Sequence, residues 1–352
     1  MFKIKSFLSV VILFLAPQFV EAAPACHLRL CSQNMHNFGN LSDSIDRQGQ
    51  LTSSQWLRQR ASNLKRIVTN ECDVIAAQEI INRDRFSAEQ NLFNYVAALK
   101  LLTRKNYRYK FIPTNDLGIG LAVIYASDLV QLMETEDLSN LELPTWRSAE
   151  RPILSNRGPL RAIFKVRCTP IIIVDLYNFH FKSKSTKGGF DPSGFGFELQ
   201  RTIQAESLRH YASKQNAELT KHASYRNYPN LTVLLGDRNS DPSSVSSAVL
   251  TGALKLKDLQ IGNCPISKTG FAYCNNIRPI PDFISIFGGL NFNYARRGTF
   301  KIGKKSLWLD DILLYTRSSW YSLVNSLQLK TGLVSAWDEA SDHAMIYGDI
   351  AW

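Results

Sequence analysis

The chain has 352 residues, of which 45% are hydrophobic and 20% are charged. This balance excludes a disordered or fibrous protein, and the length can bury a sizeable core in one large domain or in two average ones. Lysine and arginine number 41 against 30 acidic residues, a formal net charge of +11. A positive field favours polyanionic partners such as nucleic acid or a phospholipid surface, and charge alone does not choose between the two.

The first residues have the pattern of a secretory signal peptide. Two lysines precede an apolar run from Phe7 to Leu15, and the small-residue pattern Val20-Glu21-Ala22 follows at the distance of a cleavage site. A membrane anchor needs about 20 apolar residues, and Pro17 interrupts this run too early. We therefore predict a signal peptide over residues 1–22, a mature chain of residues 23–352, a secreted or periplasmic protein and no stable membrane anchor.

The cysteines support an oxidising compartment. An even number of cysteines in the mature chain allows up to three disulfides, and the absence of a Cys-x-x-Cys spacing disfavours a zinc site. Cys264 and Cys274 flank a loop with proline and glycine, so we expect these two to pair. Cys26 and Cys31 would lie roughly 16 Å apart on an extended strand and are not expected to pair with each other. The six cysteines are Cys26, Cys31, Cys72, Cys168, Cys264 and Cys274.

Short apolar, β-branched runs alternate with amphipathic segments along the chain, which predicts an α/β protein. No internal repeat or long linker divides the mature chain, so we predict a single domain over residues 23–352. In chain order the predicted elements are strands at 28–31 and 74–77, helices around 64–68 and 92–99, strands at 121–125, 162–166 and 171–177, a helix from about 197 to 217, and strands at 231–235, 312–315 and 345–347.

Polar residues that strands do not need stand at the ends of these apolar runs, where the catalytic groups of sheet enzymes gather. Each alone has a structural explanation, such as a turn or a solvated strand end. Their conjunction at five strand ends is harder to explain in that way. The five segments are Ser32-Gln33-Asn34, Gln78-Glu79, Asn178-Phe179-His180, Gly236-Asp237-Arg238-Asn239 and Ser341-Asp342-His343, and in addition Asp310-Asp311 precedes the predicted strand at 312–315.

In this order the motifs resemble those of the endonuclease/exonuclease/phosphatase superfamily, which includes pancreatic deoxyribonuclease, sphingomyelinases and inositol-polyphosphate 5-phosphatases. The resemblance covers nearly the whole mature chain. It implies a four-layer α/β/β/α sandwich of two mixed β-sheets flanked by helices, with a metal-dependent phosphodiesterase site at one edge.

The resemblance and the chemistry of phosphodiester cleavage imply roles for the motif residues. A hard cation such as Mg²⁺, with Mn²⁺ or Ca²⁺ as alternatives, takes carboxylate and carbonyl oxygens, so Glu79, Asn34 and Asp342 are the expected metal ligands. The expected catalytic residues are His180, Asp237, Asn239, Asp310 and His343, with Asp237 activating the water and Asp310 orienting His343. Asp311 is the alternative partner of His343. The expected substrate-binding residues are Asn178, Lys182, Lys184, Lys187 and Arg238, the last in place of the family's usual apolar residue.

These observations predict a Mg²⁺-dependent phosphodiesterase, a monomer by default. Because lysines follow the Asn-x-His motif, we expect phosphate-backbone contacts and hence an endonuclease acting on DNA rather than RNA. A secreted sphingomyelinase or phosphoinositide phosphatase on the same scaffold is the alternative, because Phe190, Phe195 and Phe197 in the glycine-rich loop suit either bases or a lipid interface. A non-catalytic binding module would lack a metal or base residue, and none is missing.

Overall fold

A computed structural model of the chain describes residues 26–43, 45–46, 49–113, 118–139, 141–143, 153–154, 157–183, 197–240, 244–251, 259–261, 277–279, 293–294, 299–302, 305–309, 311–316, 332–333 and 343–352. The predicted signal peptide and the predicted Cys264–Cys274 disulfide lie outside these residues.

Two six-stranded sheets form the centre of the fold, and each mixes parallel and antiparallel pairs. The first sheet has the order β19 (Gly332–Leu333), β21 (Ile346–Ala351), β1 (His27–Phe38), β4 (Val74–Ile81), β6 (Ile119–Ala126) and β5 (Tyr107–Pro113). The second has the order β15 (Asn293–Tyr294), β18 (Asp311–Thr316), β12 (Asn230–Asp237), β11 (Ile173–His180), β10 (Leu160–Val166) and β7 (Val130–Asp137).

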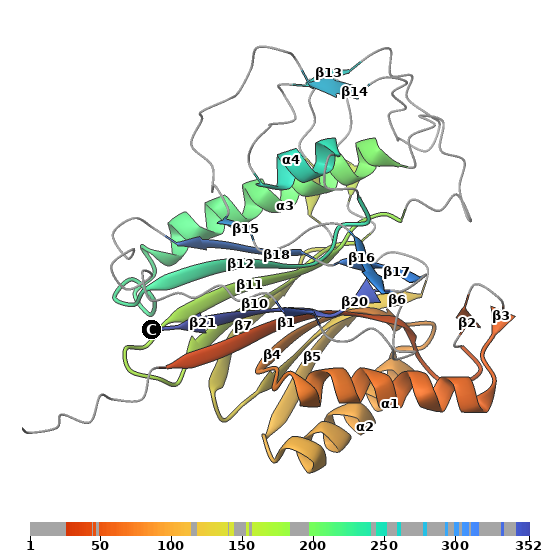
Figure 1. The fold of residues 1–352 in the computed structure, drawn as a ribbon. Helices are drawn as coiled ribbons and strands as arrows, with labels where there is room; N and C mark the ends of the chain where they lie inside the picture. Colours follow the sequence, from red (N-terminus) through yellow and green to blue (C-terminus); the bar gives the residue numbers. More distant parts are fainter. Residues whose placement is uncertain are drawn as a thin grey trace, which may run out of the picture.

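Helices lie on the outer face of each sheet (Figure 1). The first sheet is covered by α1 (Ser53–Thr69) and α2 (Arg85–Thr103), and the second by α3 (Glu198–Leu219) and α4 (Val245–Thr251). The predicted four-layer sandwich is therefore confirmed. The remaining strands are short: β2 (Ile45–Asp46), β3 (Gly49–Gln50), β8 (Glu142–Leu143), β9 (Ile153–Leu154), β13 (Leu259–Ile261), β14 (Ile277–Pro279), β16 (Thr299–Ile302), β17 (Lys305–Leu309) and β20 (His343–Ala344).

Alternating apolar side chains on the strands build separate cores between the layers. The sheets pack against each other through residues such as Val74, Val123, Phe164, Val174 and Val233. On the other face of the first sheet, side chains such as Ile75 and Ile124 pack against Leu92 and Val96 of α2. Two buried faces on each central strand explain why the sequence shows continuous apolar runs instead of strict alternation.

The helices covering the first sheet have well-formed starts. Thr52 caps α1 in a capping box with Gln55, and the carboxylate of Asp84 accepts hydrogen bonds from the backbone N–H groups of Phe86 and Ser87 at the start of α2. Such caps satisfy N–H groups that have no partner within the helix. Among the described residues, no helix is both long enough and apolar enough to cross a bilayer.

Each predicted element has a counterpart in the structure, and the central strands are longer than predicted. The strands β1, β4, β11 and β12 continue through the polar motifs, so the motif residues lie inside their carboxyl ends. The strands β5 and β7 were not predicted, because charged residues interrupt their apolar pattern. Met345 is not part of the last strand, which begins at Ile346.

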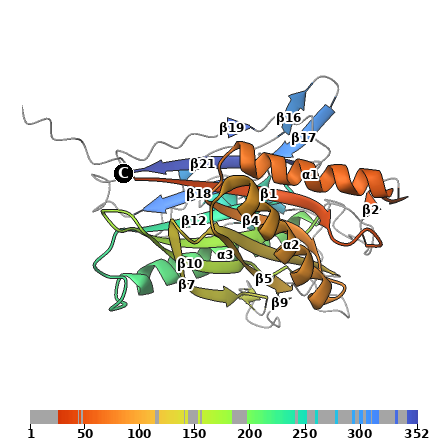
Figure 2. The ribbon, with the colours of Figure 1, turned by 90° about the horizontal axis from the view of Figure 1, so that it is seen from below.

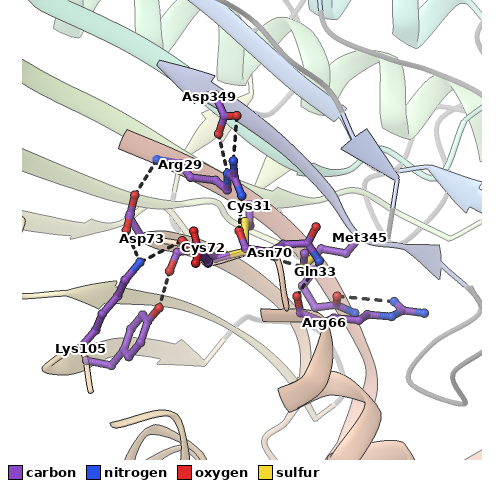
Figure 3. The surroundings of a disulfide bond; sticks show 12 residues. Arg29, Cys31, Gln33, Arg66, Asn70, Cys72, Asp73, Lys105, Met345 and Asp349 are labelled. Carbon is purple, nitrogen blue, oxygen red and sulfur yellow. Dashed lines mark hydrogen bonds and ion pairs between the residues drawn. A yellow bond between two sulfur atoms is a disulfide. The ribbon is translucent and has the colours of Figure 1, made fainter. Parts of the chain in front are cut away.

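Two disulfides join distant parts of the chain. Cys26 pairs with Cys168 and Cys31 with Cys72, so Cys26 and Cys31 do not pair with each other, as predicted. The buried Cys31–Cys72 bond belongs to the core between the first sheet and its helices, next to the polar residues at the amino ends of β1 and β4 (Figure 3). The Cys26–Cys168 bond ties the start of β1 in the first sheet to the segment after β10 in the second.

Candidate active site

Three ionisable side chains from both sheets meet at the carboxyl ends of the central strands. Glu79 comes from β4, His180 from β11 and Asp237 from β12. His180 Nε2 lies 3.8 Å from Glu79 Oε1 and 3.5 Å from Asp237 Oδ2. His180 and Asp237 are 3% exposed, whereas the Glu79 side chain is 19% exposed, so the cluster reaches solvent mainly through Glu79.

Strand pairing brings these residues together. In the parallel β11–β12 pair, His180 stands opposite Asp237 in the register. On β4 the pairing with β6 shifts between Ala77 and Ile80, and Glu79 takes a left-handed backbone conformation with φ of 59°. Such a bulge redirects a side chain relative to the regular pleat, and strained backbone of this kind is typical of functional sites. The bulge therefore accounts for the position of Glu79.

Gly236 allows the close approach of the strands next to Asp237. A Cβ atom at this position would lie 1.9 Å from the carbonyl oxygen of Phe179. Only glycine leaves room for that oxygen. The Phe181 N–H then donates to the Asp237 carbonyl, which extends the β11–β12 contact beyond the last strand residues.

A buried pair of carboxamides holds the two sheets together beside the cluster. Gln78 Nε2 donates to Asn178 Oδ1 at 2.8 Å, and Asn178 Nδ2 donates to the backbone carbonyls of Ala77 and Ala122 at 2.9 and 2.8 Å. Asn178 has no exposed surface. The structure thus places this predicted substrate-binding residue between the sheets, with its amide group engaged by protein groups.

Asn34 on β1 faces the two carboxylates with its nitrogen. Its Nδ2 donates to Glu79 Oε1 at 3.1 Å and to Asp237 Oδ2 at 3.2 Å, while its Oδ1 accepts from the His36 N–H at 2.9 Å. The Asn37 N–H donates to Glu79 Oε2 at 3.1 Å. A backbone N–H can only donate and a carboxylate can only accept, so this network fixes the amide orientation. The oxygen that was expected to bind a metal is engaged by the backbone.

Asn239 and Arg238 follow Asp237 in a tight turn. The Asn239 N–H donates to Asp237 Oδ1 at 2.8 Å, and its side chain donates to the Phe181 carbonyl at 3.0 Å. Asn239 is in the left-handed region with φ of 57°, a conformation that asparagine adopts more readily than most residues. Arg238 is buried, and its Nη2 lies 3.3 Å from the Ser240 carbonyl. This turn immobilises the Asp237 carboxylate.

Arg157 belongs to the cluster although its motif was not recognised in the sequence. It is 8% exposed, and its Nη1 lies 3.1 Å from His180 Nε2 and 3.0 Å from the Phe181 carbonyl. The sequence contains a signal for this position. Arg-Gly-Pro directly precedes β10, and Leu160 of β10 pairs with Asn178 in the antiparallel register. That register sets residues just before Leu160 beside His180.

The other predicted site residues are described in part or not at all. Lys182 is half-buried, with Nζ 4.2 Å from the ring centroid of Phe197. The backbone of His343 begins β20, which pairs with Trp308 of β17. Asp310, Asp342, Lys184 and Lys187 lie outside the described residues, as do Phe190 and Phe195.

The cluster has the composition of a cation site. One ligand atom from each of Glu79, His180 and Asp237 lies within 4.8 Å of the others. The two carboxylates receive hydrogen bonds from the Asn34 side-chain amide and from the backbone N–H groups of Asn37 and Asn239. Arg157 has only N–H donors, so it can donate to His180 Nε2 only when that nitrogen carries no proton, while the same nitrogen also faces the carboxylates of Glu79 and Asp237, which can only accept. The carboxylate oxygens therefore fit a hard divalent cation.

Comparisons with known proteins support the fold. No family model matches the sequence, and no curated protein matches it. Among solved structures, ANGEL2, described as a 2′,3′-cyclic phosphatase, is 13% identical over 93% of this chain and 96% of its own, with a TM-score of 0.56. An endonuclease/exonuclease/phosphatase protein from Bacteroides vulgatus is 15% identical over 92% of this chain and 98% of its own, with a TM-score of 0.51. The predicted resemblance to that superfamily is thus confirmed for the fold.

Proposed function

We propose that the protein is a metal-dependent phosphodiesterase. The observation that carries this proposal is the convergence of Glu79, His180 and Asp237 from three strands of both sheets, with the two acids held by amide donors. Two acids held within 4.8 Å of each other and of His180 repel each other, and a bound metal with an anionic substrate suits such an assembly. The fold shared with ANGEL2 and the Bacteroides vulgatus protein is compatible with this chemistry.

Asp237 is the proposed general base. It would accept a proton from a water molecule as the water oxygen forms its bond to phosphorus, and the ester P–O bond on the opposite side would break in line. The Asn239 N–H on Oδ1 and the Asn34 amide on Oδ2 fix the rotation of this carboxylate. Orienting the base in advance removes part of the entropic cost of the reaction.

Glu79 is the proposed principal metal ligand, and Asp237 borders the same position. A bound Mg²⁺ ion, or Mn²⁺ or Ca²⁺ in its place, would neutralise the phosphate and stabilise the charge that develops on it. Asn34 and Asn37 position Glu79 by donating to its two oxygens. Asn34 therefore acts as a positioning donor in this proposal, and Asp342 stays a proposed additional ligand.

Arg157, in contact with His180, forms the proposed cationic side of the site. The Arg157 guanidinium reaches the cluster through its contact with His180. It would contact a non-bridging phosphate oxygen, and His180 would hold the guanidinium in place. His343, with Asp310 or Asp311, is proposed to donate to the phosphate from the other side of the site.

The proposed substrate is DNA, with RNA as a second choice. A net charge of +11 and the lysines Lys182, Lys184 and Lys187 after β11 suit a backbone that presents successive phosphates. The two disulfides fit an oxidising compartment, which supports the proposal of a secreted or periplasmic enzyme.

The test is hydrolysis by the purified mature chain of plasmid DNA, RNA and sphingomyelin vesicles, before and after exhaustive treatment with EDTA. We expect DNA cleavage that is lost with EDTA and restored by Mg²⁺, and that falls by at least about 100-fold in Glu79→Gln. Glu218→Gln is the matched control, because that acid lies on an exposed helix surface. Metal-independent cleavage would overturn the metal assignment. Cleavage of sphingomyelin alone would replace the nuclease proposal by a lipid phosphodiesterase.

A further inference from the structure

The two helices on the first sheet differ in the surface that they present to solvent. The outer surface of α1 carries polar residues such as Ser54, Arg58 and Lys65, with Leu57 as its one large apolar residue exposed there. The outer surface of α2 carries Phe86, Phe93 and Leu101, which are 75%, 60% and 84% exposed. The helices lie side by side on the same face of the molecule (Figures 1 and 2).

The exposed apolar residues of α2 form a stripe. Phe86, Phe93 and Leu101 follow each other at intervals of about two helical turns, so they project from the same side of the helix. The opposite side, with Leu92, Val96 and Leu99, is buried against the sheet. A helix that is apolar on both sides is expected to have a partner on its second side.

Basic residues accompany this stripe. Lys100 and Arg104 are exposed in the last turn and at the C-cap of α2, on the side of the stripe. The helix contains one acidic residue, Glu89, whose Oε1 lies 3.0 Å from Arg85 Nε. The neighbouring α1 has four basic residues and no acidic one. We define the α2 outer face as Phe86, Phe93, Lys100, Leu101 and Arg104.

We propose that the α2 outer face docks on an anionic phospholipid surface. Aromatic and aliphatic side chains with flanking lysine and arginine are the composition of helices that lie in the plane of a bilayer interface. A second copy of the chain would bring the same positive charge against the face. A nucleic acid would satisfy the basic residues and leave the apolar stripe against its charged backbone. The lipid surface satisfies both features, and the proposal is independent of the proposed catalytic function.

The experiment is co-sedimentation of the full mature chain with vesicles of phosphatidylcholine, with and without phosphatidylglycerol. We expect binding to the anionic vesicles that weakens with salt, and weak binding to the neutral ones. The triple variant Phe86→Ser, Phe93→Ser, Leu101→Ser should lose at least about tenfold in partition coefficient, because it removes most of the apolar area available for insertion. Lys100→Gln with Arg104→Asn should lose binding to anionic vesicles selectively.

The matched control replaces exposed apolar residues on the other sheet. Leu129, directly before β7, and Met133, within β7, are 36% and 38% exposed, and Leu129→Ser with Met133→Ser should bind vesicles like the wild type. Thermal unfolding of every variant verifies folding. Absence of wild-type binding to anionic vesicles would overturn the proposal, as would undiminished binding by the triple variant. Sedimentation velocity showing a wild-type dimer that the triple variant lacks would assign the face to a second copy instead.

Discussion

The two ends of β1 carry polar networks that differ in the balance between acidic and basic side chains. At the amino end, Arg29 binds Asp349 through Nε and Nη2, at 2.5 and 3.0 Å, and Lys105 lies 2.7 Å from Asp73 (Figure 3). Two cations there balance two anions. At the carboxyl end, Glu79 and Asp237 lie in one cluster around His180 and receive amide hydrogen bonds.

This difference separates stability from function in physical terms. Paired charges at the amino end offset their own desolvation, so they can contribute to folding. At the carboxyl end two acids share one histidine, His180, and the left-handed backbone of Glu79 and Asn239 holds them in position. We infer that the amino end stabilises the fold, whereas the carboxyl end is maintained at a cost for ligand binding.

The largest expected effect is the loss of the Cys26–Cys168 disulfide at the amino end. The bond closes a loop with a sequence separation of 142 residues, and in the chain-entropy model such a loop contributes about 5 kcal/mol to the free energy of unfolding. Urea denaturation of Cys26→Ser with Cys168→Ser should show this loss, while the specific activity of the folded fraction stays at the wild-type level. An unchanged denaturation midpoint would contradict the inference that the amino end of β1 stabilises the fold.

The next effect concerns the paired charges. Asp349→Asn removes the anion that faces Arg29, and the two side chains are only 10% and 19% exposed. We expect a loss of about 3 kcal/mol in the free energy of unfolding, because breaking a largely buried pair leaves a charge without its partner. Glu218→Gln, which breaks an exposed pair with Lys221, should cost less than about 0.5 kcal/mol. Equal effects in the two variants would show that burial does not matter here.

At the carboxyl end we expect a substitution to lower activity much more than stability. Asp237→Asn should lower turnover by at least about 100-fold, equivalent to about 2.7 kcal/mol in the activation barrier. Its free energy of unfolding should change by less than about 1 kcal/mol, because the lost hydrogen bond from Asn34 is offset by weaker repulsion of Glu79. Steady-state kinetics and urea denaturation on the same preparation separate the two quantities. Wild-type turnover in this variant would remove Asp237 from the proposed mechanism.

The sequence predicts the central strands well, because each is an apolar, β-branched run buried on both faces. It predicts the convergence of Glu79, His180 and Asp237 through the order of the motifs. It does not predict which cysteines pair: Cys31 meets Cys72 because Leu30 pairs with Val74 in the parallel register, which is a long-range property. The sequence also does not predict the roles of Asn34 and Asn178, because these depend on which amide atom faces which neighbour. The position of Arg157 beside His180 depends on the register between β10 and β11.

The smallest expected effect comes from an exposed carboxylate, Asp84 at the start of α2. Hydrogen bonds from the Ser87 hydroxyl and from the N–H groups of Ser87 and Phe86 lower the pKa of Asp84 below its usual 3.8. Because the folded-state pKa is depressed, the ionised cap stabilises the protein above pH 3.8, and this contribution disappears as the pH falls through the folded-state value. Asp84→Asn keeps a capping oxygen and removes the charge. The difference in urea midpoint between wild type and Asp84→Asn should therefore be present at neutral pH and vanish in acid. A difference that is independent of pH would mean that the Asp84 charge does not contribute to stability. The comparison of charges would then concern only the buried carboxylates at the two ends of β1.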